Sequence, residues 1–196
     1  MYKKTKKYIV YTIPDQNKRS GIFYPRKIRW NPLCNKKLAA PKKKNQGFKW
    51  WEHVTEIWAV ATNIYIEGTF PNGVQYYMAS AIQLMHNMMV AHAKAVIAYK
   101  EAGYEGKIGI VHSLESKYPY DETKDEDVKA AKNEDVLNNQ FLLDATFLGK
   151  YRDETMEIIN RLVELNNGSF HASKDDMEIL KEAAYWYREV SKTKEL

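Results

Sequence analysis

The sequence predicts an α/β protein with parallel strands. A strand-like run at residues 48–57 is followed by a helical pattern at 74–102 and by a second apolar strand at 108–114. Strands that alternate with long helices are typical of a parallel sheet, because each helix carries the chain back across one face of the sheet. Three more helical stretches follow, at residues 125–147, 153–166 and 173–192.

The first half of this domain is predicted from residue type and periodicity. Aromatic and β-branched residues dominate the first strand, as the pleated surface of a sheet favours. Pro71 and the Asn72-Gly73 pair then mark a turn, because they supply fixed and positive φ values. The long helix is predicted to end at Gly103. Its apolar face consists of Met78, Ile82, Met85, Met89, Ala93, Val96 and Ile97, spaced as on one side of a helix.

The boundaries of two later helices also have local signals. The helix at 125–147 opens with acidic residues, which suit the positive end of the helix dipole, and it ends near Gly149. The helix at 173–192 has Ser173 as its N-cap and Asp176 at the third helical position. That spacing is a capping-box pattern, in which each side chain satisfies a backbone N–H of the other residue.

The net charge of +5 conceals two parts of opposite charge. Residues 1–45 hold 14 Lys or Arg and one acid, Asp15, whereas the remaining residues hold 16 basic and 24 acidic side chains. The sequence therefore predicts a basic, poorly ordered extension at 1–46 and an α/β domain at 47–196. An alternative is that the basic arm binds RNA through phosphate contacts and base stacking. No RNP-type or zinc pattern accompanies it, so nucleic acid is the less favoured partner.

Composition places the chain among globular proteins. Hydrophobic residues make up 44% and charged residues 28% of the chain, as in ordinary folded domains. No apolar run approaches the length of a spanning helix, so no membrane association is expected. The basic N-terminus lacks the apolar core of a signal peptide. The single cysteine, Cys34, cannot form an internal disulfide and predicts a reducing, cytoplasmic location.

Glu56 is the first candidate functional residue. It follows an aromatic strand at its carboxyl end, where parallel α/β proteins place their chemistry. A carboxyl packed against Trp51 and Trp58 would be poorly solvated, which raises its pKa and suits it to donate a proton near neutrality. The alternative is an ordinary strand-end glutamate paired with a lysine. Local sequence leaves both interpretations open.

The histidines suggest no metal site. His86 and His92 share the long helix but stand six residues apart, so they lie on different faces and cannot form the i, i+4 pair of a zinc helix. Both are interpreted as packing or polar-face residues. His112, in the second strand, is either a satisfied core histidine or a residue of the cleft. Without a Gly-rich phosphate loop, a Cys/His cluster or a Ser-His-Asp pattern, we expect neither a metal nor another cofactor.

Five pieces of the chain carry a resemblance to a known family. They are residues 69–73, 86–96, 104–114, 117–121 and 143–151, in this order. Together, between residues 48 and 184, they resemble the middle of a family 1 glycoside hydrolase, nearest to the 6-phospho-β-galactosidases. The resemblance implies a (β/α)₈ TIM-type barrel and hydrolysis of O-glycosidic bonds in phosphorylated β-galactosides, a step of carbohydrate metabolism. It also implies a phosphorylated disaccharide as substrate.

The resemblance assigns roles to two adjacent residues. Glu56 matches the Glu of the family's Asn-Glu motif at the end of the fourth barrel strand, which implies a catalytic role as proton donor and general acid/base. Thr55 stands at the Asn position. The family's Asn binds the sugar 2-hydroxyl through a hydrogen bond that strengthens in the transition state. A threonine has a shorter reach, so this substrate contact is weakened or lost.

Other parts of the family pattern are missing from the sequence. Retaining glycosidases need a second carboxylate about 5–5.5 Å from the first, and the family carries it in a Thr-Glu-Asn-Gly run that this sequence lacks. The matching segment holds about two of eight barrel strands. The resemblance therefore implies a truncated glycosidase, inactive by itself. The alternatives are a binding or structural remnant that pairs with a complementing chain or forms an oligomer, or an RNA-binding protein that uses the basic arm.

Overall fold

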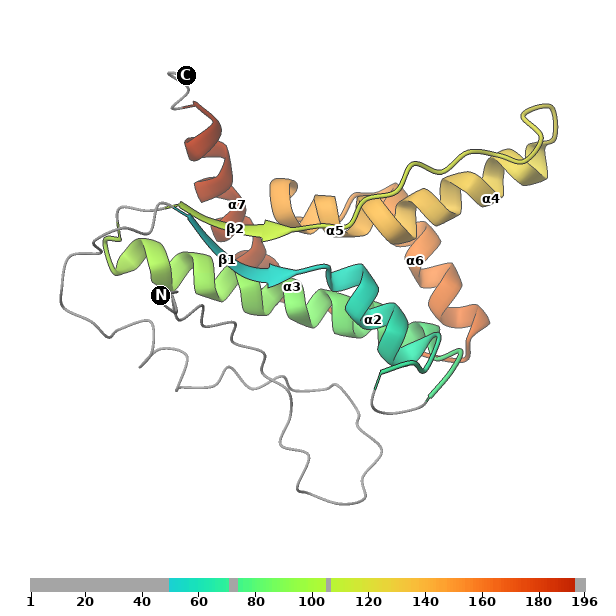
Figure 1. Ribbon diagram of the computed structural model, residues 1–196, viewed down its shortest axis with the longest axis horizontal. Coiled ribbons are helices and arrows are strands. Elements are labelled where there is room, and N and C mark those ends of the chain that lie inside the picture. Colours follow the sequence, from blue (N-terminus) through green and yellow to red (C-terminus); the bar gives the residue numbers. More distant parts are fainter. Residues whose placement is uncertain (1–49, 71–73, 105–106, 193–196) are drawn as a thin grey trace, which may run out of the picture.

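The computed structural model describes residues 50–70, 74–104 and 107–192 of the chain. Figure 1 shows the arrangement of these residues, a two-stranded sheet packed on a long helix with the remaining helices around it. The basic segment 1–46 lies outside the described residues, and so does the predicted turn at 71–73. The extension and its RNA-binding alternative therefore remain predictions.

The predicted parallel pairing of the two strands is confirmed. Strand β1 (Trp50–Thr55) pairs in parallel with β2 (Lys107–Val111), from Trp50 beside Lys107 to Thr55 beside Val111. Helix α3 (Met78–Glu101) connects them and contacts both strands. The helix ends at Ala102, and Gly103 follows with a φ of 69°, the left-handed conformation that commonly terminates helices. The predicted stop at Gly103 is thus confirmed.

Helix α3 is the centre of the packing. Besides the sheet it contacts α2, α6 and α7, and most of the predicted apolar face is buried, with Met78 and Ile97 partly buried. His86 and His92 are almost fully buried, so their interpretation as packing residues is confirmed. Because α3 is contacted on several sides, it buries residues outside the predicted apolar face as well, including the two histidines. The predicted members that are fully buried are Ile82, Met85, Met89, Ala93 and Val96.

One helix was not predicted. Strand β1 ends at Thr55, and helix α2 (Ile57–Tyr65) begins two residues later. Its sequence begins Ile-Trp-Ala-Val, whose β-branched and aromatic residues favour a strand, and no side chain caps its first turn. Burial stabilises it instead. Ile57, Ala61 and Tyr65 recur at the four-residue spacing of one helix face and all enter the core.

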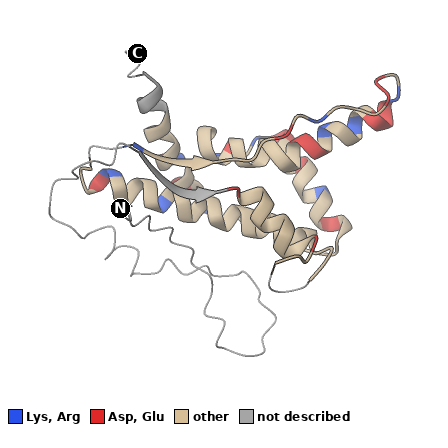
Figure 2. Cartoon of the chain, in the orientation of Figure 1, with Lys and Arg blue, Asp and Glu red and all other residues tan. Residues whose placement is uncertain are grey.

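The helical segment that follows the sheet has the predicted extent. It consists of α4 (Asp125–Asp135), η1 (Val136–Gln140), α5 (Phe141–Leu143) and η2 (Asp144–Leu148). The elements η1 and η2 are wider turns with i→i+5 hydrogen bonding, a form of helix that often occurs at functional sites. Helix α4 buries no residue, and the red and blue segments of the ribbon in Figure 2 mark acidic and basic positions along it. The later turns enter the core.

Two helices complete the packing, α6 (Asp153–Leu165) and α7 (Lys174–Lys192). The predicted capping box at the start of α7 is confirmed. The Asp176 amide donates to the Ser173 Oγ at 3.1 Å, and the Ser173 amide donates to the Asp176 carboxylate at 3.0 Å. Helix α7 packs on α3 and η2, which places its N-terminal turn beside His86.

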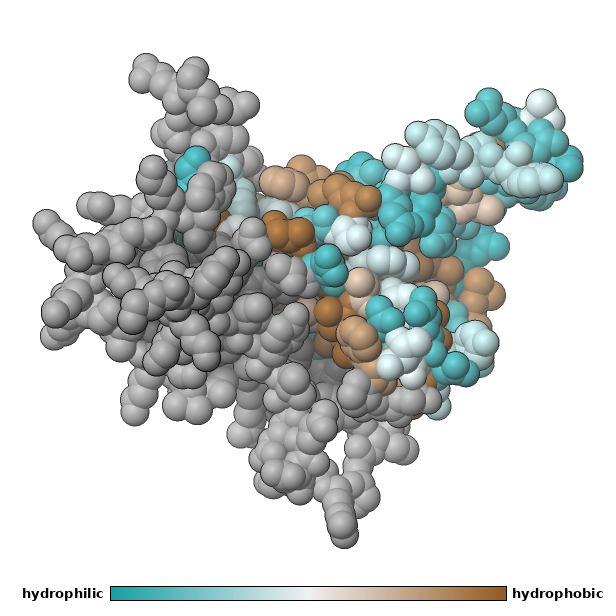
Figure 3. Space-filling model, viewed as in Figure 1, coloured by the Kyte–Doolittle hydropathy of each residue, from teal (hydrophilic) through white to brown (hydrophobic). Residues whose placement is uncertain are grey.

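Helices cover one face of the sheet and leave the other more open. A Cβ added to Gly109 would meet no atom within 4 Å, and Val111, two residues further along the same face, is 38% exposed. Phe147 and Leu148 of η2 are also exposed, and Figure 3 shows brown side chains at the surface where η2 and β2 lie. Parallel sheets are usually covered on both faces. None of the described helices is both long and apolar enough to cross a membrane.

Candidate active site

The carboxyl ends of the two strands meet at Glu56. Thr55 and Val111 are the last paired residues, and the Glu56 backbone N–H donates to the Val111 carbonyl oxygen at 2.8 Å. Glu56 is therefore one residue beyond β1, and His112 is one residue beyond β2, at the same end of the sheet. The structure brings together two residues that the sequence singles out separately.

The backbone of Glu56 adopts a left-handed conformation. Its φ is 53° and its ψ 49°, values that are uncommon for residues other than glycine, asparagine and aspartate. In a regular strand, successive side chains alternate between the two faces. The left-handed residue ends that alternation, so the direction of the Glu56 side chain is set by the turn and not by the strand.

The Glu56 side chain is exposed. The prediction of a poorly solvated carboxyl is therefore wrong, because the residues around the end of β1 do not enclose it. Its carboxylate makes no hydrogen bond or ion pair with another described residue, so the alternative of a lysine pair is not observed among them either. Left-handed backbone costs roughly 1–3 kcal/mol and tends to be retained where function requires it.

His112 is held by the helical segment that follows β2. Its Nε2 lies 2.8 Å from the Thr146 Oγ1, and that hydroxyl donates its proton to the Leu142 carbonyl at 2.8 Å. Because a hydroxyl has one proton to donate, the His112 Nε2 must be the donor toward Thr146. The Nδ1 atom is buried and has no hydrogen-bond partner among the described residues. Burial lowers the pKa of His112, which favours the neutral ring.

His112 is not a fully satisfied core histidine, because only its Nε2 has a hydrogen-bond partner among the described residues. The same is true of His86, whose Nε2 is buried without a partner. Thr146 lies in the piece 143–151 that resembles the family, but no sequence pattern links it to His112. The two residues come into contact only through the packing of η2 beside the end of β2, a contact between residues 34 apart in the chain.

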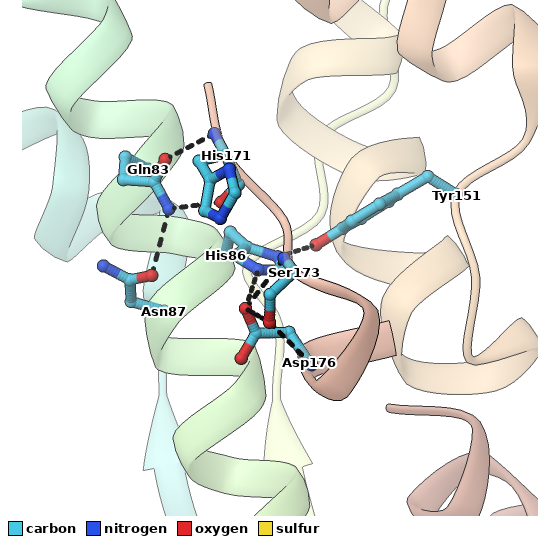
Figure 4. Close-up of polar contacts among 7 residues, drawn as sticks. All are labelled: Gln83, His86, Asn87, Tyr151, His171, Ser173 and Asp176. Atoms are coloured by element: carbon cyan, nitrogen blue, oxygen red, sulfur yellow. Dashed lines mark hydrogen bonds and ion pairs between the residues drawn. The ribbon is translucent and has the colours of Figure 1, made fainter. Parts of the chain in front are cut away.

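A second polar cluster surrounds His86 of α3, between this helix, Tyr151 and the start of α7 (Figure 4). The His86 Nδ1 and the Tyr151 hydroxyl are 2.8 Å apart, while its Nε2 lies 3.7 Å from the Asp176 carboxylate, too far for a hydrogen bond. Burial lowers the pKa of His86, and the Asp176 charge opposes that shift. Burial raises the pKa of Asp176, but its hydrogen bonds with Ser173 outweigh this and hold it below its ordinary value.

This cluster has the residue types of a nucleophilic triad without its geometry. In such a triad the histidine takes the proton of the serine hydroxyl. Here the Ser173 Oγ donates to Asp176 at 2.7 Å as part of the capping box, and the His86 ring is fully buried. The cluster holds the start of α7 against α3. It is a structural element and lies away from the strand ends.

The described residues offer no metal-binding group, since nowhere among them do three or more His, Cys, Asp or Glu side chains converge. Thr55, the other residue predicted for the site, is the last residue of β1. The carboxyl end of the sheet therefore carries one exposed carboxylate, at Glu56, and one partly buried imidazole, at His112, each one residue beyond its strand. Proton donation to a leaving group needs such a carboxyl, whereas covalent glycosidase chemistry needs a second one.

A connecting helix over parallel strands, with an exposed acid one residue beyond the first strand, defines an α/β protein of the kind that carries enzyme sites at its strand ends. The chain belongs to glycosyl hydrolase family 1, whose sequence pattern matches residues 42–187. This match confirms the resemblance inferred from the sequence.

Its relatives include proteins named as 6-phospho-beta-galactosidases. The chain is 46% identical over 134 residues to the 6-phospho-beta-galactosidase of Staphylococcus haemolyticus, covering 68% of this chain and 29% of that enzyme. It is 47% identical over 135 residues to the Staphylococcus epidermidis enzyme of the same name, with 69% and 29% covered. The chain therefore spans less than a third of the length of either relative.

Solved structures show the same relationship. A family 1 β-glucosidase from Thermotoga maritima superposes with a TM-score of 0.55 at 30% identity, over 67% of this chain and 28% of that one. A β-glucosidase from Exiguobacterium marinum gives 0.58 at 27% identity, over 68% and 30%. The two-stranded arrangement is thus similar to part of a larger family 1 fold.

Proposed function

We propose that this chain carries the proton-donor part of a glycosidase of the 6-phospho-β-galactosidase type. In this proposal residues 47–196 are a partial (β/α)₈ unit that includes the fourth and fifth barrel strands, and Glu56 is the general acid/base. The main observation that supports this proposal is the position of Glu56, which is exposed and lies one residue beyond β1 at the carboxyl end of the sheet. The names of the relatives support a β-galactoside phosphorylated at the 6-position as the substrate.

The 196-residue sequence does not turn over substrate by itself in this proposal. Retaining glycosidases use a nucleophilic carboxylate about 5–5.5 Å from the acid/base residue. The sequence lacks the Thr-Glu-Asn-Gly run of the family nucleophile. An aryl 6-phospho-β-galactoside should therefore remain intact with the wild-type chain and with Glu56→Gln alike. A clear rate that is lost in Glu56→Gln would contradict the inactive state.

A chimeric enzyme tests the role of Glu56 directly. Residues 48–184 would replace the matching segment of the Staphylococcus haemolyticus enzyme, whose remainder then supplies the nucleophile. We expect the chimera to hydrolyse the aryl phosphogalactoside and Glu56→Gln to lower kcat by roughly a hundredfold to ten-thousandfold, the usual loss for a general acid. Glu52→Gln, in the same strand, is the control and should keep most of the rate. Equal losses in the two variants would remove Glu56 from this role.

A second candidate function is a remnant that pairs with another chain. The open face of the sheet at Gly109 and Val111, with exposed Phe147 and Leu148, supports this alternative, because parallel sheets are usually covered on both faces and exposed apolar patches mark interaction surfaces. Sedimentation over a range of concentrations distinguishes the two. A chain that stays monomeric at high concentration, alone and with the remainder of the relative, speaks against pairing.

A further inference from the structure

The segment that leaves β2 is fixed to the helical elements at two points. At the first, the His112 Nε2 donates to Thr146 of η2 at 2.8 Å. At the second, the Asn139 side chain of η1 accepts from the Glu115 N–H at 3.2 Å and donates to the Glu115 carbonyl at 2.7 Å. One helical segment thus binds both ends of a short stretch of chain.

The spacing of these contacts has a simple geometric origin. His112 and Glu115 are three residues apart, and an extended chain of that length spans about 10 Å. Asn139 and Thr146 are seven residues apart in the helical segment formed by η1, α5 and η2, and the printed hydrogen bonds place Thr146 opposite His112 and Asn139 opposite Glu115. The stretch after β2 therefore runs antiparallel to the helical segment, with its two ends opposite two side chains of that segment.

Each contact fixes an orientation as well as a position. The Asn139 amide is nearly buried, and its NH₂ group also donates to Asp135 at 2.6 Å, which determines which side of the amide accepts from Glu115. The Thr146 hydroxyl is committed to the Leu142 carbonyl, which makes it an acceptor toward His112. The Nδ1 of His112 is consequently left buried and without a hydrogen-bond partner among the described residues, one residue beyond the end of β2.

We propose that Thr146 and Asn139 are positioning residues of the candidate site, which hold His112 beside Glu56 with its Nδ1 lone pair uncommitted. The inference rests on the proposed function, because it takes Glu56 as the acid/base residue. His112 is then a neutral hydrogen-bond acceptor of this site, and the helical segment determines where that acceptor lies.

The proposal is tested in the full chain by NMR, without turnover. A hydrogen-bonded ring N–H of His112 should give a slowly exchanging proton signal, assigned by its absence in His112→Gln. We expect Thr146→Val to speed its exchange at least about tenfold, the effect of losing one hydrogen bond, and Thr146→Ser to restore it. Equal exchange in the Val and Ser variants would overturn the proposal.

The second contact has a closely matched control. Asn139→Ala removes the bonds to Glu115, whereas Asn138→Ala removes a buried amide of the same size that has no hydrogen-bond partner among the described residues. We expect protection of the Glu115 amide to fall about tenfold in Asn139→Ala only. If both variants lose protection equally, or neither does, Asn139 is not a positioning residue.

A comparison with Glu56→Gln links this arrangement to Glu56. At fixed pH, the ring signals of His112 should differ between wild type and Glu56→Gln, and this difference should be smaller in the Thr146→Val background. Identical ring signals in wild type and Glu56→Gln would overturn the placement beside Glu56. Because these signals come from the resting chain, they are independent of the chimera: an inactive chimera with the NMR effects present would reject the proposed function while leaving the positioning contacts in place.

Discussion

The backbone N–H of Glu56 lies 2.8 Å from the carbonyl oxygen of Val111 and donates to it. This bond extends the sheet by one residue beyond the last pair. On its other side, the Glu56 carbonyl accepts from Val60 at 3.0 Å, the first hydrogen bond of α2. Both peptide groups of Glu56 are therefore held, one by the sheet and one by the helix, and its left-handed φ cannot relax without breaking one of them.

The first prediction concerns the cost of this conformation. Glu56→Gly should be more stable than Glu56→Ala by about 1 kcal/mol, because only glycine adopts a positive φ without a steric penalty. Urea unfolding of the two variants measures the difference. Asn167, at a φ of 51°, provides the control, since asparagine tolerates this conformation and Asn167→Gly should change stability by only a few tenths of a kcal/mol. If the alanine variant is as stable as the glycine variant, the left-handed backbone at residue 56 is not strained.

Much of the fold could be predicted because its signals are local. The apolar repeat of α3, the glycine after it and the Ser173–Asp176 box each depend on residues within one or a few turns. Helix α2 could not be predicted in this way. Its residues favour a strand, and it is helical because the left-handed turn at Glu56 directs its apolar face into the core. Tertiary burial overrode local preference there.

The site was predictable only in outline. The position of Glu56 at a strand end follows from the residue pattern of β1. Its exposure depends on which elements pack around the end of the sheet, and the residues of the strand do not determine that packing. The bond between His112 and Thr146 joins residues on separate elements. Its existence depends on how η2 packs, and no spacing in the sequence encodes that packing.

The second prediction is a pH dependence of stability. Burial lowers the pKa values of His86 and His112 in the folded chain. Between those values and the ordinary histidine pKa of about 6.5, the unfolded chain binds more protons. The free energy of unfolding should therefore fall as the pH drops below about 6.5. Asp176, whose folded pKa is lowered, adds a further loss below about pH 4, as its carboxylate becomes protonated.

Denaturant unfolding at a series of pH values checks this dependence. His86→Gln keeps a polar partner for Tyr151. Because glutamine does not titrate, the free energy of unfolding of this variant should fall less steeply than that of the wild type as the pH drops below about 6.5. His171→Gln is the control, since His171 is exposed and its replacement should leave most of the slope. A slope that is unchanged in His86→Gln would show that this histidine is not responsible.

The third prediction tests the contact between η2 and α7. A Cβ on Gly149 would lie 2.5 Å from the Lys181 Cα and 2.8 Å from the Leu180 carbonyl oxygen, both backbone atoms of α7. Gly149→Ala should cost about 3 kcal/mol, from overpacking and from its φ of 66°. Gly103→Ala shares a positive φ but meets no atom within 4 Å, so it should cost only about 1 kcal/mol. Similar losses for the two variants in thermal or urea unfolding would mean that α7 does not pack closely here.

The last prediction concerns Thr55, which takes the place of the family's Asn beside Glu56. In the chimeric enzyme, Thr55→Asn should raise kcat/KM about tenfold, equivalent to one regained hydrogen bond of about 1.4 kcal/mol. A bond to the sugar 2-hydroxyl strengthens in the transition state, so the gain should appear mainly in kcat and not in KM. Thr55→Val is the control and should give no gain. In the Glu56→Gln background the benefit of Thr55→Asn should shrink, because the two residues then act on a step that lacks its proton donor. A gain confined to KM would mean that the introduced asparagine improves ground-state binding only, and that the threonine is not what limits the chemical step.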